Sequence, residues 1–95
     1  MSLEKLVLKY IASTEHVLRE IEITKHSINV DGKDIRKVME YVEAYLEDAK
    51  YYRDKKKFEV GLASVAYCEG LLDALKLLGA VKFEWLTQRE KRKEE

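Results

Sequence analysis

Very little in this sequence interrupts helical geometry. The chain has no proline and only four glycines among its 95 residues, and these two residue types are the strongest local breakers of regular structure. Apolar side chains recur at helical spacing in three long segments, and in the first two they fill arcs of about 140–160°. Gly32 and Gly79 fall where such segments begin or end. We therefore predict an all-α fold with helices at about 3–25, 34–54 and 58–78.

The short connections between these helices predict how they pack. The three lysines at 55–57 form one turn, and residues 26–34 form the other. Because short connections favour antiparallel neighbours, we expect a three-helix up-and-down antiparallel bundle in which all three helices are in contact. Asp31 or Asp34 should cap the second helix, since a carboxylate accepts hydrogen bonds from the free N–H groups at a helix start.

The length predicts one domain with a short C-terminal tail. A chain of 11.2 kDa buries about 65% of the surface that its unfolded form exposes, which is enough for a single compact core. We place this domain at residues 1–86. Residues 87–95 mix both signs of charge and are expected to form a frayed, solvated end.

The third helix is apolar around most of its circumference, so a simple bundle cannot cover it. Two alternatives could cover its apolar surface: the segment 81–86 could fold back as a lid, or a second copy could bind in a symmetric homodimer. We favour the homodimer slightly. Small residues at Ala63, Ala66, Gly70 and Ala74 also recur on one stripe, which suggests close approach of another helix. The predicted interaction surface consists of Val60, Leu71, Leu75, Leu78, Phe83 and Trp85.

Composition and charge exclude several classes of protein. Eighteen basic and eighteen acidic residues give a formal net charge of zero, which removes the usual argument for a basic nucleic-acid binder. No apolar run is long enough to cross a membrane, and no secretory signal is visible. One cysteine cannot form an internal disulfide, which suits a cytoplasmic location. Abundant Lys and Glu with only two side-chain amides, Asn29 and Gln88, are typical of a thermophile.

Two stretches carry a resemblance to a known family. Residues 45–52 contain a Tyr-x-x-Asp-Ala helix pattern, and residues 66–74 contain Ala-Tyr-Cys-Glu-Gly-Leu-Leu-Asp-Ala. Together they resemble the short archaeal proteins of domain-of-unknown-function family 357, although Cys68 stands where the family pattern has alanine. The resemblance implies an archaeal source and a three-helix bundle, and it implies no known activity. The pattern residues, which we read as structural, are Tyr45, Asp48, Ala49, Tyr67, Gly70, Asp73 and Ala74.

Asp48 and Asp73 invite a reading as a carboxylate pair, but their spacing argues against it. In an antiparallel hairpin they lie about 12 Å apart along the helix axes, too far to share a proton or a metal ion. We expect Asp73 to be satisfied within its own chain, with Arg19, Tyr41 or Lys76 as its partner.

No set of residues predicts catalysis, a cofactor or a metal site. A zinc site needs about four ligands. The chain offers only His16 and His26, ten residues apart, and Cys68, which would have to join them from another helix. Cys68 lies on an apolar helix, where a thiol is usually a small core side chain.

The composition therefore favours a non-catalytic protein-interaction or self-associating module. An alternative is an accessory domain that contacts nucleotide or nucleic acid through the basic tip, formed by Arg53 and Lys55 to Lys57. The aromatic neighbours Tyr51, Tyr52 and Phe58 could stack on bases. Asp54 and Glu59 interrupt this cluster of positive charge.

Overall fold

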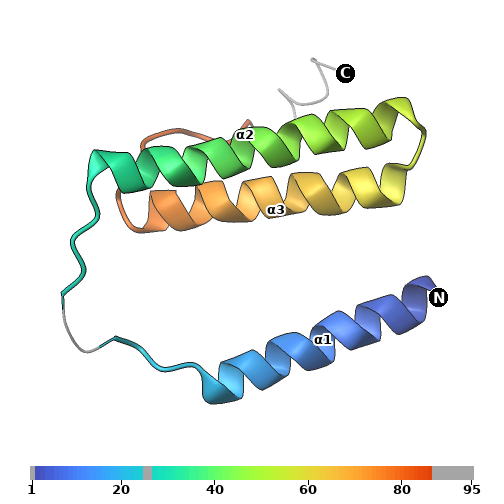
Figure 1. Cartoon of the computed structure of the whole chain (residues 1–95), viewed down its shortest axis with the longest axis horizontal. Coiled ribbons are helices and arrows are strands. Elements are labelled where there is room, and N and C mark those ends of the chain that lie inside the picture. Colours follow the sequence, from blue (N-terminus) through green and yellow to red (C-terminus); the bar gives the residue numbers. More distant parts are fainter. Residues whose placement is uncertain (1, 25–26, 87–95) are drawn as a thin grey trace.

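Three α-helices and their connections make up the described part of the computed structural model, which covers residues 2–24 and 27–86. The helices are α1 (Leu3–Glu20), α2 (Gly32–Asp54) and α3 (Phe58–Leu77). They alternate in direction along the chain (Figure 1). The all-α class and the up-and-down course of three helices are thus confirmed. The predicted frayed tail at 87–95 lies outside the described residues.

Local hydrogen bonds explain where α2 begins and where α3 ends. The Asp31 carboxylate accepts from the N–H groups of Lys33 and Asp34, at 2.9 and 3.1 Å, and the Asp34 side chain accepts from the Asp31 N–H. This reciprocal cap starts α2 at Gly32, slightly earlier than predicted. At the other end, Gly79 has a φ of 77°, the left-handed conformation that glycine adopts most readily.

The first helix is shorter than the sequence predicted. It ends at Glu20, not at about residue 25, and Ile21 is already extended. Ile21, Ile23 and Thr24 are all β-branched, and such side chains lose rotamer freedom in a helix. The periodic apolar pattern therefore continues for one residue beyond the helix itself.

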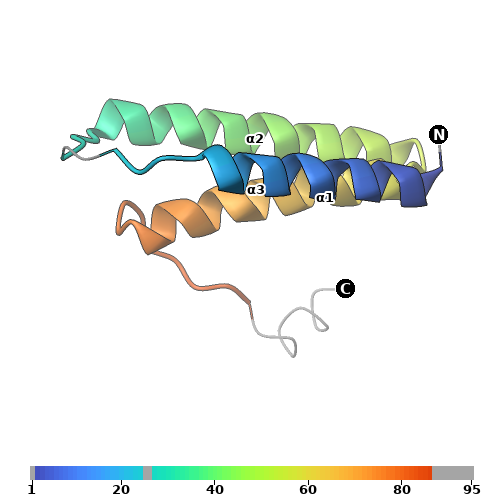
Figure 2. The ribbon, with the colours of Figure 1, turned by 90° about the horizontal axis from the view of Figure 1, so that it is seen from below.

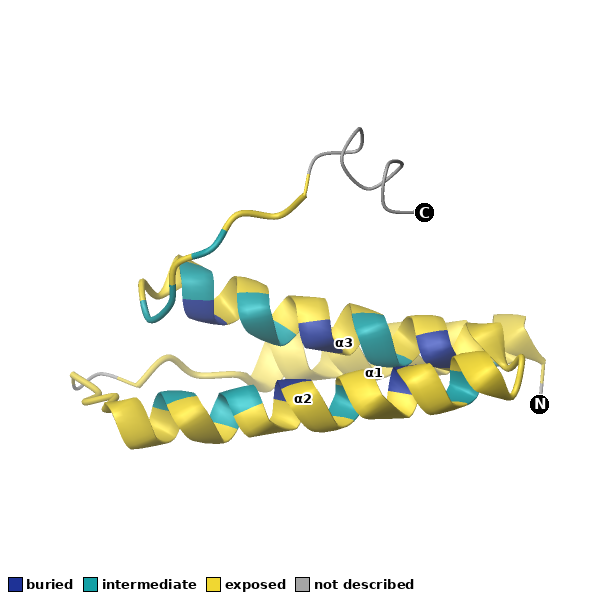
Figure 3. Ribbon diagram, turned by 90° about the horizontal axis from the view of Figure 1, so that it is seen from above, coloured by how far each residue is buried: buried dark blue, intermediate teal, exposed yellow. Residues whose placement is uncertain are grey.

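The core lies between α2 and α3. Among the described residues, the buried apolar side chains are Val42 and Ala49 of α2 and Cys68 and Leu75 of α3, each no more than 6% exposed. Figure 3 shows the buried parts of the two helices on their facing sides. The two helices approach closely at Gly61, where an added Cβ would lie 3.4 Å from the Ala49 carbonyl oxygen. Gly70 has no such neighbour, so the expected close approach is found at Gly61 and not on the Gly70 stripe.

The first helix does not pack as the sequence predicted. Among the described residues, α1 makes no backbone contact with α2 or α3, and none of its residues is buried. Only the three lysines at 55–57 separate α2 from α3, whereas residues 21–31 separate α1 from α2. The Cα radius of gyration is accordingly 16.4 Å, against about 12 Å for a compact chain of this length.

Candidate interaction surfaces

The segment that follows α3 turns back along the side of that helix. We call Ala80–Leu86 the strap. Figure 2 shows it beyond α3, on the side away from α2. The turn at Gly79 starts this reversal, with the Ala80 N–H donating to the Leu75 carbonyl at 2.9 Å, as in a Schellman motif. The strap therefore folds back on α3, but it lies on the side of Asp73 and leaves Val60 and Leu78, which the predicted lid would cover, exposed.

Two residues of α3 hold the strap. The indole Nε1 of Trp85 donates a hydrogen bond to the Asp73 carboxylate at 2.7 Å. Lys76 lies over the Phe83 ring, 4.9 Å from its centroid, and its Nζ is 3.8 Å from Glu84. Asp73 is thus satisfied within the chain, as predicted. The prediction of Arg19, Tyr41 or Lys76 as its partner is wrong, because the strap places the Trp85 indole within hydrogen-bonding distance of the Asp73 carboxylate.

The residues of the predicted interaction surface differ in burial. Leu75 is buried against α2, and Leu71 and Phe83 are half-buried. Val60, Leu78 and Trp85 remain exposed, at 45%, 77% and 38%. The part of this surface that is still open lies mainly at the two ends of α3.

The family-pattern tyrosines meet across the α2–α3 hairpin. The rings of Tyr45 and Tyr67 pack edge to face with their centroids 4.5 Å apart, and Ala49 is buried beside them in the helix interface. An edge-to-face pair adds about 0.5–1.5 kcal/mol beyond the area that it buries. These three positions therefore have a direct structural role, whereas Asp48, Gly70 and Ala74 are exposed.

Exposed and half-buried apolar side chains lie on the same side of the hairpin as this pair, and we call them the tyrosine flank. In α3, Val60 and Tyr67 lie seven residues apart, and so do Leu71 and Leu78, so each pair shares one face of the helix. Tyr41 lies one turn before Tyr45 on α2. The contact between Tyr45 and Tyr67 places both helix faces on the same side of the hairpin. The flank consists of Tyr41, Tyr45, Val60, Tyr67, Leu71 and Leu78.

A second apolar surface lies on α1, and we call it the α1 stripe. Its members occupy one arc of the helix, as the sequence predicted, and each is between 48% and 67% exposed. A hollow of about 420 Å³ is lined by Val7, Tyr10, Ile11, Thr14 and Glu15 on this helix alone. The α1 stripe consists of Leu3, Val7, Tyr10, Ile11, Val17 and Leu18.

The side chains considered for acid–base or metal chemistry do not lie together. Asp73 faces the strap, whereas Asp48 lies seven residues after Tyr41 and so on the side of the tyrosine flank. Across residues 2–24 and 27–86, no group of three or more His, Cys, Asp or Glu side chains could hold a metal ion. His16 is exposed, and His26 lies outside the described residues.

Cys68 is a core thiol, as the sequence suggested. It is 4% exposed, and its Sγ donates to the Val42 carbonyl at 3.3 Å. Burial raises the pKa of this thiol above its usual value, because a thiolate would lose its hydration. The reactive form of the cysteine is therefore disfavoured.

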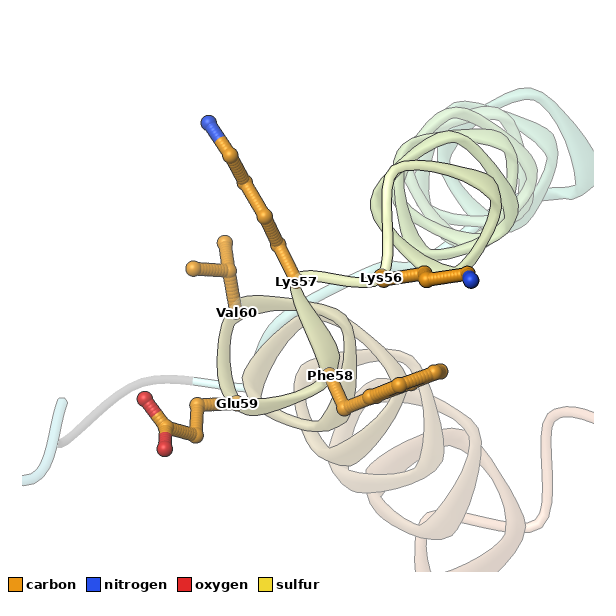
Figure 4. A pocket seen from close by; sticks show the side chains of 5 residues that line it. All are labelled: Lys56, Lys57, Phe58, Glu59 and Val60. Atoms are coloured by element: carbon orange, nitrogen blue, oxygen red, sulfur yellow. The ribbon is translucent and has the colours of Figure 1, made fainter.

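The basic tip does not form a converging cluster of positive charge. Arg53 pairs with Asp54 at 3.1 Å, and Lys55 lies over the Tyr51 ring. Lys56 and Lys57 point in different directions at the rim of a hollow that Phe58, Glu59 and Val60 also line (Figure 4). An anion bound here would meet one lysine at a time.

The sequence analysis did not predict two side-chain contacts of these surfaces, Tyr45–Tyr67 and Trp85–Asp73. The Tyr45–Tyr67 pair could have been found, because an antiparallel hairpin that turns near Lys56 places these residues at nearly the same level. The sequence indicated the Trp85–Asp73 bond only weakly: a tryptophan N–H needs an acceptor, and Gly79 predicted that the chain would turn.

No helix among residues 2–24 and 27–86 has the length and apolar character needed to cross a membrane.

Comparison with known proteins gives one match. A family model described as "Protein of unknown function (DUF357)" matches residues 9–81, which include part of α1 and all of α2 and α3. No curated protein and no solved structure is detectably similar to the chain.

Proposed function

Since the chain belongs to the DUF357 family, whose function is not known, we propose its role from its own surfaces: it is a non-catalytic protein-interaction module that acts through uncovered apolar helix faces. The observation that carries this proposal is the α1 stripe. A surface helix of a globular protein normally turns its apolar stripe toward a core. In α1 no residue is buried.

The amount of exposed surface supports the proposal. The chain exposes 8994 Å², whereas a compact protein of 11.2 kDa exposes about 5,700 Å². Counting every residue outside the described ranges as fully unfolded removes at most about 1,900 Å² of this difference. The remaining excess of roughly 1,400 Å² is larger than the about 800 Å² that each partner buries in a standard protein–protein interface.

A second copy of the chain is the first partner to test. Val60 and Leu78, two exposed members of the predicted surface, share one face of α3 and lie at its opposite ends. A face of this kind can be self-complementary about a two-fold axis. The unpaired Cys68 and the Lys- and Glu-rich composition fit a cytoplasmic protein of a thermophilic archaeon.

Sedimentation velocity from low to high micromolar concentration tests self-association. We expect the mass to rise toward that of a dimer, and Val60→Lys to shift this rise to higher concentration. Leu62→Lys is the matched control, because Leu62 is 69% exposed and lies on the opposite flank of α3. A wild-type chain that stays monomeric throughout would refute self-association, and equal effects of the two variants would refute the surface.

Contact with nucleotide or nucleic acid through the basic tip is the second candidate. The hollow beside Lys56, Lys57 and Phe58 is the observation that favours it, since a cation and an aromatic ring can hold a phosphate and a base. A single-stranded RNA oligonucleotide should then bind with an affinity that falls steeply with salt. Binding that survives Lys56→Ala with Lys57→Ala would exclude the tip.

A further inference from the structure

We propose that the strap is an edge strand that pairs with the strap of a second copy, antiparallel about a two-fold axis at Phe83. This inference rests on the proposed function, because it assumes that the chain associates with itself. It adds a contact surface on the strap side of α3, separate from Val60 and Leu78. The two straps together form a two-stranded β-ribbon that crosses from one chain to the other.

The backbone of the strap offers hydrogen-bonding groups to a partner. Residues 81–86 belong to no helix, and the Ala80 N–H makes the last backbone hydrogen bond before them. No backbone group of 81–86 is hydrogen-bonded to another described residue. Figures 2 and 3 show no helix on the outer side of the strap. Unpaired N–H and C=O groups along an uncoiled segment are a template for a second strand.

Burial alternates along the strap, as it does along a strand that lies on a core. Val81 and Phe83 are half-buried, whereas Lys82 and Glu84 are exposed. Trp85 returns to α3 through its hydrogen bond to Asp73. Since successive side chains of a β-strand point to opposite faces, the inner face of the strap lies on α3 and its outer face carries the two charges.

The charges on the outer face are self-complementary. In an antiparallel pair centred on Phe83, Lys82 of one copy lies opposite Glu84 of the other, and the same pair forms again across the axis. Opposite charges at such positions stabilise a sheet, whereas like charges oppose it. A parallel pair in register would place Lys82 opposite Lys82, so the charges select the antiparallel direction. The contact of Glu84 with Lys76 is loose, at 3.8 Å, and leaves the Glu84 side chain 93% exposed.

The inner face of the strap matches in the same register. Phe83 lies opposite Phe83 of the second copy, and Val81 lies opposite Trp85. Aromatic pairs, and pairs of an aromatic with a β-branched side chain, are favourable neighbours across two strands. The ribbon also forms about four to six backbone hydrogen bonds, which use the groups that a single strap leaves unpaired.

Leu77 supplies apolar area beneath the ribbon. It is 88% exposed and follows Lys76, whose Nζ lies over the Phe83 ring, so it stands at the level of the axis. Around the helix it lies about 40° beyond Asp73, on the side away from the buried Leu75. Two copies of Leu77 therefore approach each other beside Phe83 in the paired state, and this contact removes apolar surface from water.

Reversal of charge in the strap tests the pairing by sedimentation velocity. Glu84→Lys leaves two lysines on the outer face and Lys82→Glu leaves two glutamates, so each variant opposes its own pairing. We expect each to raise the dimer dissociation constant about 10-fold. An equimolar mixture of the two restores both ion pairs and should associate like the wild type. The double variant Lys82→Glu with Glu84→Lys exchanges the two charges and should do the same, although it loses the contact with Lys76.

Two controls separate the strap from net charge. Glu43→Lys makes the same change of charge at an exposed site of α2 and should leave association unchanged. A mixture of Glu43→Lys with Lys82→Glu has the same net charges as the first mixture but only one matched ion pair, so it should form heterodimers more weakly.

Amide hydrogen exchange shows whether the backbone takes part. In the wild type we expect alternate amides of the strap to gain protection as concentration rises, because every second residue of a strand in an antiparallel pair is hydrogen-bonded to the other strand. Association without this alternate protection would overturn the inference.

The remaining outcomes distinguish the strap from the face of Val60. A wild type that stays monomeric, or a mixture that associates no better than its two components, would overturn the strap pairing. If Val60→Lys weakens association and the strap variants do not, the inference is wrong and the proposed function stands. If association follows the strap charges and ignores Val60→Lys, the inference stands and the face of Val60 is excluded.

Discussion

Trp85 is joined to Asp73 by a hydrogen bond of 2.7 Å from the indole Nε1 to the carboxylate. The bond connects the strap to α3 across twelve residues of sequence. Because Trp85 is the only tryptophan in the chain, its fluorescence reports directly on whether the strap is in place.

Removing the carboxylate should loosen the strap without unfolding the hairpin. We expect Asp73→Ala to shift the Trp85 emission to longer wavelength and to lower stability by about 1 kcal/mol, since both side chains are partly solvated and a charged hydrogen bond is then worth less than when buried. Glu69→Ala removes an exposed carboxylate one turn earlier on α3 and serves as the control. An unchanged emission spectrum in Asp73→Ala would contradict the role given to this bond.

The two helical glycines should respond differently to substitution. Gly70→Ala should stabilise the protein by about 0.5–1 kcal/mol, because alanine favours helix and no atom lies within 4 Å of the added Cβ. Gly61→Leu should destabilise it by at least about 1–3 kcal/mol, since the Ala49 carbonyl and the Tyr52 side chain leave no room for a larger group. Thermal unfolding measures both. A destabilised Gly70→Ala variant would show that another segment packs on that stripe.

Cys68 should make stability fall at alkaline pH. Burial raises its pKa in the folded state above the ordinary value of 9.0, so the unfolded chain releases its thiol proton first as the pH rises. The contribution is fully present below pH 9.0 and is lost as the pH rises through the folded-state pKa. The measurement is the difference in unfolding free energy between wild type and Cys68→Ala as a function of pH. A difference that does not shrink above that pH would contradict this assignment.

The Asp31 side chain that caps α2 should contribute more to stability than the neighbouring Lys33 side chain. Asp31→Ala removes the acceptor of two N–H groups and should cost about 1 kcal/mol. Lys33→Ala changes a side chain that takes no part in the cap and should cost little. Chemical denaturation compares the two variants, and equal losses would mean that the cap contributes nothing specific.

Local chemistry in the sequence predicted the helices well. Asp31 and Asp34 were the two candidates for the cap of α2, and Gly79 marked the end of α3, because a cap and a left-handed turn depend on residues that lie next to each other. The periodic apolar pattern also identified the stripe of α1. Each of these signals acts over a few residues of chain.

The sequence could not predict what covers each face. An apolar stripe such as that of Val7 and Ile11 shows that a partner surface is needed, but its pattern is the same whether that surface is near or far. The hydrogen-bond partner of Asp73 could not be predicted for the same reason. Its level in the bundle suggested Arg19 or Tyr41, whereas the path of the strap places Trp85 beside it. Long-range placement depends on loop conformation, which the periodicity of helices does not encode.

The turn of three lysines between α2 and α3 has a consequence for the order of folding. It makes Ala49 and Gly61 neighbours in space although few residues separate them in sequence, and such local contacts form quickly because little loop entropy is lost. The α2–α3 hairpin is therefore the natural folding nucleus. Substitutions at its interface should slow folding, whereas substitutions in the α1 stripe should leave the folding rate almost unchanged.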